Sequence, residues 1–218
     1  MTLEAIERIE ALKQYYGITQ DGELVVRGIE ARRHDTPKFI KRFQVELLNT
    51  LFDCNNTEEI MTKGYENALL LVTITMDKIM IGGKDIDQED LVISKLLGQN
   101  INKYKSLFPH VCGAIKLSAN NDGALPPKGD VIKYIYTDAQ HSNPLCRISP
   151  IKDTEKENLR YDKEKYREMI LDAAQSVLGY FGFDRTIYGD RRNTTPRKWR
   201  WLQEIRQQRE KDIKTEMK

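Results

Sequence analysis

The sequence predicts an α+β protein in which a small part containing a β-hairpin comes first and a mainly helical body follows. Two runs rich in β-forming residues, Tyr15–Thr19 and Leu24–Ile29, flank Asp21-Gly22, and glycine there supplies the positive φ of a tight turn. Beyond about Thr36, apolar residues recur three and four positions apart, as in amphipathic helices. Strands that precede helices in this way favour the α+β class.

Composition and charge limit the classes of function without selecting one. A chain of 218 residues has room for one hydrophobic core with a smaller appendage. The formal net charge of +2 does not require a nucleic-acid partner, but residues 185–218 carry eleven Lys or Arg against five Asp or Glu. Cys54, Cys112 and Cys146 match no zinc or redox spacing, so three reduced thiols are expected.

The N-terminal sequence and the longest apolar run indicate a soluble protein. Met1–Gln14 contains Glu4, Glu7 and Glu10 instead of the basic start and apolar centre of a secretory signal. The longest mostly apolar run, Ala68–Met76, is far too short to cross a bilayer. We therefore expect a cytoplasmic protein with no membrane partner.

One predicted helix precedes the hairpin and another follows it. Apolar residues at helical spacing predict a helix over Thr2–Gln14. Asp35 or Thr36 can cap the second helix, which should run to about Phe52. Its buried face is expected to consist of Ile40, Phe43, Leu47, Leu48 and Leu51.

The remaining segments predict mostly helices. A long helix over Thr57–Met80 should stop at Gly82-Gly83, because glycine is a poor helix former. Glu89–Leu97 has a mixed pattern that fits no single type of element. The other predicted elements are a short helix over Pro109–Leu117, a loop over Asn120–Gly129, a strand over Val131–Tyr136, a helix over Asp162–Phe181 and a last helix from Thr195-Pro196.

The sequence contains no recognisable catalytic or metal-binding pattern. His34-Asp35 has the form of a ligand pair in metal phosphohydrolases, but only two further histidines exist to complete such a site. Gly83-Lys84 is followed by Asp85 where a phosphate-binding loop needs Ser or Thr. We therefore predict no catalytic residue, no metal ligand and no cofactor bound by this chain.

Several short motifs occur in an order that is typical of one protein family. They are Lys13–Gly17, Arg27–Glu30, Arg33–Asp35, Lys41–Gln44, Asp90–Lys95, Pro109–Leu117, Gly129–Tyr134 and Tyr161–Tyr166. Seven of them resemble, in this order, the Lys-Lys-Arg-Tyr-x-Gly, Gly-Ile/Leu-Glu, Arg-Arg-Asp, Lys-x-x-Gln, Pro-His-Val-x-x-Ala-x-Lys-Leu, Gly-Asp-x-Ile-x-Tyr and Tyr-Asp-x-Glu-x-Tyr patterns of family B DNA polymerases. Asp90–Lys95 resembles the start of the second half of the thumb in this family. The resemblance covers about Lys13–Asp184 and corresponds to the end of the palm and the thumb.

The sequence departs from the family pattern in two ways. Leu12 and Gln14 replace a lysine and the arginine of the first motif, which weakens the DNA contact expected there. The exonuclease, the fingers and the three metal and nucleotide motifs have no counterpart, and Tyr188-Gly189-Asp190 copies only the first half of the polymerase metal motif. Because the second carboxylate is missing, this segment is predicted to be a turn.

The resemblance implies a palm remnant over residues 1–36, a thumb domain over residues 37–184 and a basic C-terminal helical tail over residues 185–218. In this arrangement the chain is similar to the small subunit of a split archaeal family B DNA polymerase. Such a subunit is non-catalytic and grips primer–template DNA, while a large subunit carries the exonuclease, the fingers, most of the palm and the Mg²⁺. Gln175-x-x-Leu178-x-x-Phe181 half-matches a sliding-clamp peptide, although its position inside an amphipathic helix favours the core.

Basic and aromatic residues of the matched motifs are the candidates for DNA contact, because lysine and arginine release counterions when they neutralise phosphates. Lys13 is the candidate for the minor groove, with Tyr15 beside it. Arg33 can bind a phosphate or brace Asp35. The other candidates are Lys38, Lys41, Lys95, Lys105, His110 and Lys116. A solvated face is the alternative for Lys38 and Lys41, and a structural hydrogen bond is the alternative for His110.

Further expectations concern the partners. The basic tail with Trp199 and Trp201 can dock on a subunit or DNA, or form a solvated helix held by ion pairs. A severed palm leaves a sheet edge and apolar surface, so Leu3, Ile6, Ile9 and the hairpin are expected to dock into the large subunit. The competing hypothesis is a stand-alone nucleic-acid- or protein-binding module with a thumb-like fold.

Overall fold

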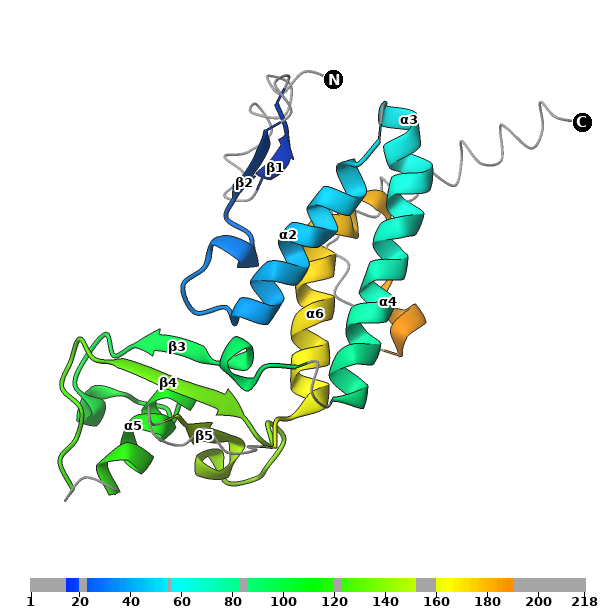
Figure 1. The fold of residues 1–218 in the computed structure, drawn as a ribbon. Coiled ribbons are helices and arrows are strands. Elements are labelled where there is room, and N and C mark those ends of the chain that lie inside the picture. The colour runs from blue at the N-terminus through cyan, green and yellow to red at the C-terminus, as the bar shows by residue number, and fades with distance from the viewer. Residues whose placement is uncertain are drawn as a thin grey trace, which may run out of the picture. The chain divides into compact units, whose positions relative to one another are not determined.

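The computed structural model describes residues 15–19, 23–54, 56–82, 86–119, 123–151 and 160–189. Its helices and its two small antiparallel sheets confirm the α+β class (Figure 1). Within those ranges no helix is both long enough and apolar enough to span a bilayer. The predicted helices over Thr2–Gln14 and from Thr195-Pro196 lie outside the described residues.

Contacts within the chain divide it into two compact units. The first unit comprises residues 1–29, 43–75 and 170–218, and the second comprises residues 30–42 and 76–169. Helices α2 (Lys38–Phe52), α4 (Tyr65–Ile81) and α6 (Lys163–Leu178) each contribute one part to each unit. The predicted boundaries of the palm remnant, thumb and tail, after residues 36 and 184, are not defined by contacts and differ from those of the two units. These boundaries stay predictions.

In the first unit, β1 (Tyr15–Ile18) and β2 (Leu24–Arg27) form the predicted hairpin. Tyr16 lies opposite Val26, and Tyr15 lies opposite Arg27. Residues that are directly paired share a face of the hairpin, and neighbours along a strand lie on opposite faces. Tyr16 and Val26 therefore occupy one face, and Tyr15 and Arg27 occupy the other.

Tyr16 anchors the first of these faces on the helices of the same unit. Its hydroxyl donates to the backbone carbonyl of Val177 in α6. Its ring centroid lies 6.3 Å from those of Phe52 and Tyr180. Because burial removes the phenol from water, the pKa of Tyr16 is raised far above its ordinary value. The half-buried Tyr16, whose phenol stays protonated, and the buried Val26 thus lie on the face that packs against the helices.

The helical part of the first unit buries one side of each helix. Gln44 Nε2 in α2 donates to the carbonyl of Ala173 in α6 at 3.0 Å, and the rings of Tyr65 and Phe181 stack with centroids 6.1 Å apart. The predicted buried face of α2 is confirmed, since its members Ile40, Phe43, Leu47, Leu48 and Leu51 are all buried.

The predicted helix over Thr57–Met80 is confirmed, with one irregular turn inside it. Helix α3 (Thr57–Glu59) starts at Asn56, whose side chain accepts from the N–H of Glu59 at 2.9 Å. A π-helical turn over Ile60–Gly64 leads into α4. A Cβ atom on Gly64 would lie 2.4 Å from the carbonyl oxygen of Leu51, so the close approach of this turn to α2 requires glycine.

The second unit contains a three-stranded antiparallel sheet with a helix packed on it (Figure 1). The strands lie in the order β3 (Ile93–Leu96), β4 (Val131–Tyr136) and β5 (Ile148–Pro150). Helix α5 (Pro109–Ala119) approaches so closely that a Cβ atom on Gly113 would lie 2.8 Å from Ile132 Cγ2. The buried cluster here consists of Ile93, Leu97, Cys112, Ala114, Ile132, Tyr134 and Ile148.

The elements of the second unit match the sequence predictions in part. The strand over Val131–Tyr136 and the short helix from Pro109 are confirmed. The ambiguous segment Glu89–Leu97 consists of the end of a 3₁₀ turn (Gln88–Leu91) and then β3. Strand β5 was not predicted, because Ile148-Ser149-Pro150 is too short to show an alternating pattern.

Candidate nucleic-acid interface

Asp35 is the centre of a charged cluster in the second unit. Arg33 Nε lies 3.3 Å from Asp35 Oδ1, and the ammonium of Lys95 in β3 donates to the other carboxylate oxygen. Burial raises the pKa of the Asp35 carboxyl, but the hydrogen bond from Lys95 and the charges of Arg33 and Lys95 outweigh burial and hold the pKa below its ordinary value. Of the two alternatives for Arg33, the structure contains the contact with Asp35.

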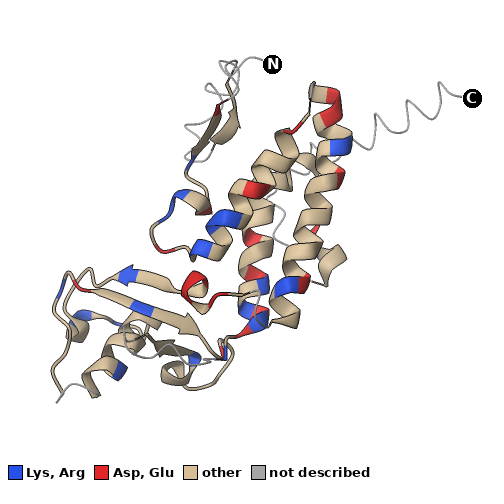
Figure 2. Cartoon of the chain, viewed as in Figure 1, with Lys and Arg blue, Asp and Glu red and all other residues tan. Residues whose placement is uncertain are grey.

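Basic residues gather along the first turns of α2 (Figure 2). Lys38 is exposed, Lys41 is half-buried, and Arg42 forms an ion pair with Asp90. The N–H of Lys41 donates to the carbonyl of Pro37 at 3.1 Å, so Pro37 immediately precedes the first turn of the helix. A phosphate near this helix end would meet both lysines and the backbone N–H groups of the first turn.

His110 in the first turn of α5 belongs to an aromatic cluster. Its ring stacks on Phe108 with centroids 5.9 Å apart and an interplanar angle of 15°. The rings of His110 and Tyr104 meet edge to face with centroids 5.4 Å apart. Burial lowers the pKa of His110 below its ordinary value, and the charge of Lys95 adds to this effect. The ring is therefore uncharged near neutral pH, which suits stacking better than phosphate binding.

The charged cluster and the aromatic cluster line one pocket of about 520 Å³ within the second unit. Residues of its lining that carry polar or aromatic groups include Asp35, Lys95, Tyr104, Phe108, His110 and Lys165. Lys95 and His110 were separate candidates in the sequence. Tyr104, Phe108 and Lys165 were not singled out, because only the folded chain brings them to the same place.

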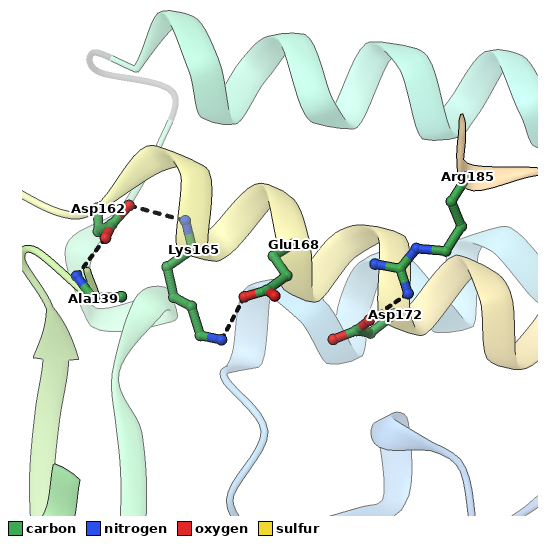
Figure 3. A network of polar contacts seen from close by, with 6 residues as sticks. All are labelled: Ala139, Asp162, Lys165, Glu168, Asp172 and Arg185. Carbon is green, nitrogen blue, oxygen red and sulfur yellow. Dashed lines mark hydrogen bonds and ion pairs between the residues drawn. The ribbon is translucent and has the colours of Figure 1, made fainter. Parts of the chain in front are cut away.

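Lys165 enters the pocket from α6. Its ammonium lies 5.6 Å from the centre of the Tyr136 ring and 2.5 Å from a carboxylate oxygen of Glu168 (Figure 3). The preceding turn is fixed by Asp162, whose carboxylate accepts from the N–H groups of Lys165 at 2.9 Å and Ala139 at 2.6 Å. Asp162 thus caps α6, which gives the Tyr161–Tyr166 motif a structural role.

Lys105 and Lys116 lie in the same unit outside the pocket lining. Lys116 Nζ donates to the carbonyl of Ile148 at 2.7 Å and so ties α5 to β5. Lys105 is exposed in the segment that leads to α5. Contact of these two lysines with DNA stays a prediction.

In the first unit, the hairpin face opposite Tyr16 carries a basic and aromatic pair. The guanidinium carbon of Arg27 lies 5.8 Å from the centre of the Tyr15 ring. A guanidinium over a tyrosine ring is a flat surface that can contact sugars and base edges in a groove. Arg27 is thus a further candidate for DNA contact. It is recognised from the register of the hairpin, which places it opposite Tyr15.

Two further features of the first unit bear on the sequence predictions. Leu178 is buried and Phe181 stacks on Tyr65, so these two residues of the half-matched clamp peptide contribute to packing. Binding to a sliding clamp stays untested. Arg185 is buried and donates to Asp172 Oδ1 at 2.6 Å (Figure 3), so the first arginine of the predicted tail belongs to the folded unit.

Some predicted residues lie outside the described part of the chain. Lys13, the docking residues Leu3, Ile6 and Ile9, and the tail beyond Gly189 are among them. Among the residues that the structure describes, no group of three or more His, Cys, Asp or Glu could hold a metal ion.

Comparison with known proteins now identifies the family. Residues 9–180 match the family model described as DNA polymerase family B. The DNA polymerase of Pyrococcus horikoshii is 30% identical over 175 residues, which are 79% of this chain and 13% of that protein. The DNA polymerase of Archaeoglobus fulgidus is 30% identical over 185 residues, which are 78% of this chain and 22% of that protein.

Solved structures agree with the fold. The structure of the family B DNA polymerase from the hyperthermophilic archaeon Pyrobaculum calidifontis has a TM-score of 0.60 and 22% identity, and covers 77% of this chain and 20% of that chain. The chain thus spans less than a quarter of the length of the relatives that it matches. Since the family match takes in most of this chain, the chain belongs to DNA polymerase family B.

Proposed function

We propose that this chain is the palm-and-thumb part of a family B DNA polymerase and works as a non-catalytic subunit that grips primer–template duplex. A separate large subunit would carry the exonuclease, the fingers and the metal-binding palm. The observation that carries this proposal is the family match over residues 9–180, which takes in the hairpin and the helical part of the chain. The Mg²⁺ needed for nucleotide transfer would be bound by the large subunit.

The hairpin supports a partner on the palm side. A two-stranded hairpin alone is marginally stable, and an exposed strand edge can pair with a further strand. Among the described residues, β1 and β2 pair only with each other, and Ile18 and Val25 are 41% and 38% exposed. We infer that the free edge of the hairpin pairs with a strand of the large subunit, so that Ile18 and Val25, on opposite faces of the hairpin, lie at the joined sheet.

The basic residues support a grip that does not depend on DNA sequence. Such a grip needs contacts with phosphates and with the minor groove rather than with the base edges that distinguish sequences. Lys38 and Lys41 offer phosphate contacts in the second unit, and Tyr15 with Arg27 offers a groove contact in the first unit. Each neutralised phosphate should add about −0.9 to the slope of log affinity against log salt.

Reconstitution of primer extension tests the proposal. A polypeptide with exonuclease, fingers and palm is assayed on a primed template over a range of salt concentrations, with and without this chain. The expected result is that the added chain raises the salt concentration at which extension fails. If the chain binds duplex firmly but leaves extension unchanged at every salt concentration, it is a stand-alone binding module instead.

A further inference from the structure

The pocket in the second unit has a lining that a grip on the phosphates and grooves of paired DNA does not require. Its volume of about 520 Å³ falls within the range of roughly 300–1,000 Å³ that is usual for small-molecule sites. Duplex DNA presents phosphates and grooves but keeps its bases stacked inside the helix. A concave site with aromatic lining therefore suits a nucleotide that is not paired.

Aromatic rings form the first part of this site. Phe108 lines the pocket and is 50% exposed. Its ring stacks on His110 and meets the Tyr104 ring edge to face, with the centroids of Phe108 and Tyr104 6.3 Å apart. The two neighbouring rings hold Phe108 in place while leaving part of it open. A base can stack on such a ring whatever its identity, because every base has a π-face.

The charges of the lining form the second part. Lys95 and Lys165 are cationic and Asp35 is anionic, while Arg33 pairs with Asp35 and Glu168 pairs with Lys165. Three cationic and two anionic residues, with His110 uncharged near neutral pH, leave one net positive charge. The ammonium of Lys95 gives one of its three N–H donors to Asp35, and the Lys95 side chain is 43% exposed, so the remaining donors are available to a ligand. A phosphodiester carries one negative charge and matches this balance.

We propose that the pocket binds one unpaired nucleotide of a DNA strand, with its base on the ring of Phe108 and its phosphodiester at Lys95. The proposal deepens the proposed function, because it names a second form of DNA that the same subunit recognises. A strand that leaves the duplex, such as the single-stranded template or a frayed primer end, supplies such a nucleotide. A free mononucleotide shares this chemistry and is distinguished by experiment.

The direct test uses the whole chain and a fluorescent base. A single-stranded hexathymidylate with 2-aminopurine at its third position is titrated with the protein, and stacking on Phe108 quenches the fluorescence. Phe108→Ala should remove the quenching and weaken binding about tenfold, which corresponds to roughly 1.4 kcal/mol. Leu107→Ala is the matched control, since Leu107 is also 50% exposed but lies outside the pocket lining, and it should leave the quenching unchanged.

A charge variant tests the phosphate contact. Lys95→Met should weaken binding and reduce the salt slope by about 0.7, the value for one phosphate of a single strand. Lys128→Met removes an exposed lysine of the same unit outside the pocket and should retain the quenching. A thermal melt followed by circular dichroism establishes that each variant is folded, and Phe108→Tyr, which keeps the ring, should restore quenching if Phe108→Ala does not fold.

Three further arms decide between the sources of the ligand. When the 2-aminopurine is paired in a duplex, addition of the protein should not lower its fluorescence. A single strand that lacks the base at this position should bind about tenfold more weakly than the intact strand. Quenching of free 2-aminopurine deoxynucleoside monophosphate at equal affinity would assign the pocket to free nucleotides and overturn the proposal. Equal quenching by wild type and Phe108→Ala would also overturn it.

The outcome is separable from that of the proposed function. Quenching without any effect on primer extension would retain the pocket and reject the polymerase subunit. Stimulation of extension without quenching would retain the subunit and reject the pocket.

Discussion

Asp35 and Lys95 are sixty residues apart in the sequence, and their contact joins the segment before α2 to β3. The sequence marks Lys95 as a DNA candidate and Arg33 as either a phosphate contact or a brace for Asp35. The Arg33–Asp35 contact is local in the sequence, whereas the Lys95–Asp35 contact is not. Lys95 reaches Asp35 because β3 is held at a fixed register against β4. At the residue scale, the identity of a charged side chain is readable from sequence, whereas its partner depends on pairing between distant segments.

The lowered pKa of Asp35 gives a prediction about stability and pH. Because the folded-state pKa lies below the ordinary value of 3.8, the ionised carboxylate stabilises the fold above that pH, and the contribution is lost as the pH falls through the lowered pKa. Asp35→Asn should reduce the free energy of unfolding at pH 7 by about 1 kcal/mol or less, since Lys95 and Arg33 are partly exposed. Urea denaturation at a series of pH values measures this.

The comparison with wild type should be repeated in acid. The difference between Asp35→Asn and wild type should shrink as the pH falls below 3.8 and disappear once the carboxyl is protonated in both states. A difference that stays constant down to pH 2 would show that Asp35 acts through packing rather than through its charge.

Lys38 and Lys41 give a prediction about DNA. Changing both to Met should reduce the slope of log duplex affinity against log salt by about 1.8, if each contacts one phosphate. Lys63→Met is the control, because Lys63 is an exposed lysine in the π-helical turn before α4. Fluorescence anisotropy of a labelled duplex measures the slopes. An unchanged slope in the double variant would assign both lysines to a solvated face.

At the scale of elements, the sequence predicts those with a long periodic pattern. The helix expected to reach about Phe52 ends there, and the strand over Val131–Tyr136 has the predicted bounds. The sequence does not predict strand β5, because its three residues take an extended conformation through pairing with β4. Strand β5 also supplies the carbonyl of Ile148 that accepts from Lys116, a contact that the sequence does not reveal.

The π-helical turn before α4 gives a prediction about packing. Gly64→Ala should destabilise the protein by about 1–3 kcal/mol, because the added Cβ would overlap the backbone carbonyl of Leu51, which cannot rotate away. Gly17→Ala is the control, since a Cβ there meets nothing within 4 Å. Thermal unfolding measures both. Equal melting temperatures for the two variants would mean that the approach of this turn to α2 is not tight.

The hairpin gives a prediction about assembly. Ile18→Asp with Val25→Asp should abolish co-purification with the large subunit, because a buried carboxylate without a partner is strongly unfavourable in an interface. Val45→Asp is the matched control, since Val45 in α2 is 41% exposed, as Ile18 is. Co-purification of the hairpin variant at the wild-type level would exclude the hairpin from the interface.

At the scale of the whole molecule, the order of short motifs predicts the family, and the family match over residues 9–180 confirms it. The motifs could not predict the pocket, since its lining comes from the segment before α2, from β3, β4 and α6, and from the residues around the start of α5. The surfaces by which this chain would contact a large subunit likewise form only in the folded chain, so short sequence motifs describe them only in part.

We propose that this chain holds duplex DNA for carboxylates on another molecule. The most direct measurement is the length of product made in one binding event, with excess unlabelled DNA added as a trap at the start of the reaction. We predict that the purified chain alone incorporates no nucleotide and that its addition to the large subunit lengthens the product several-fold. Incorporation by the chain alone, or product of unchanged length in its presence, would contradict the account.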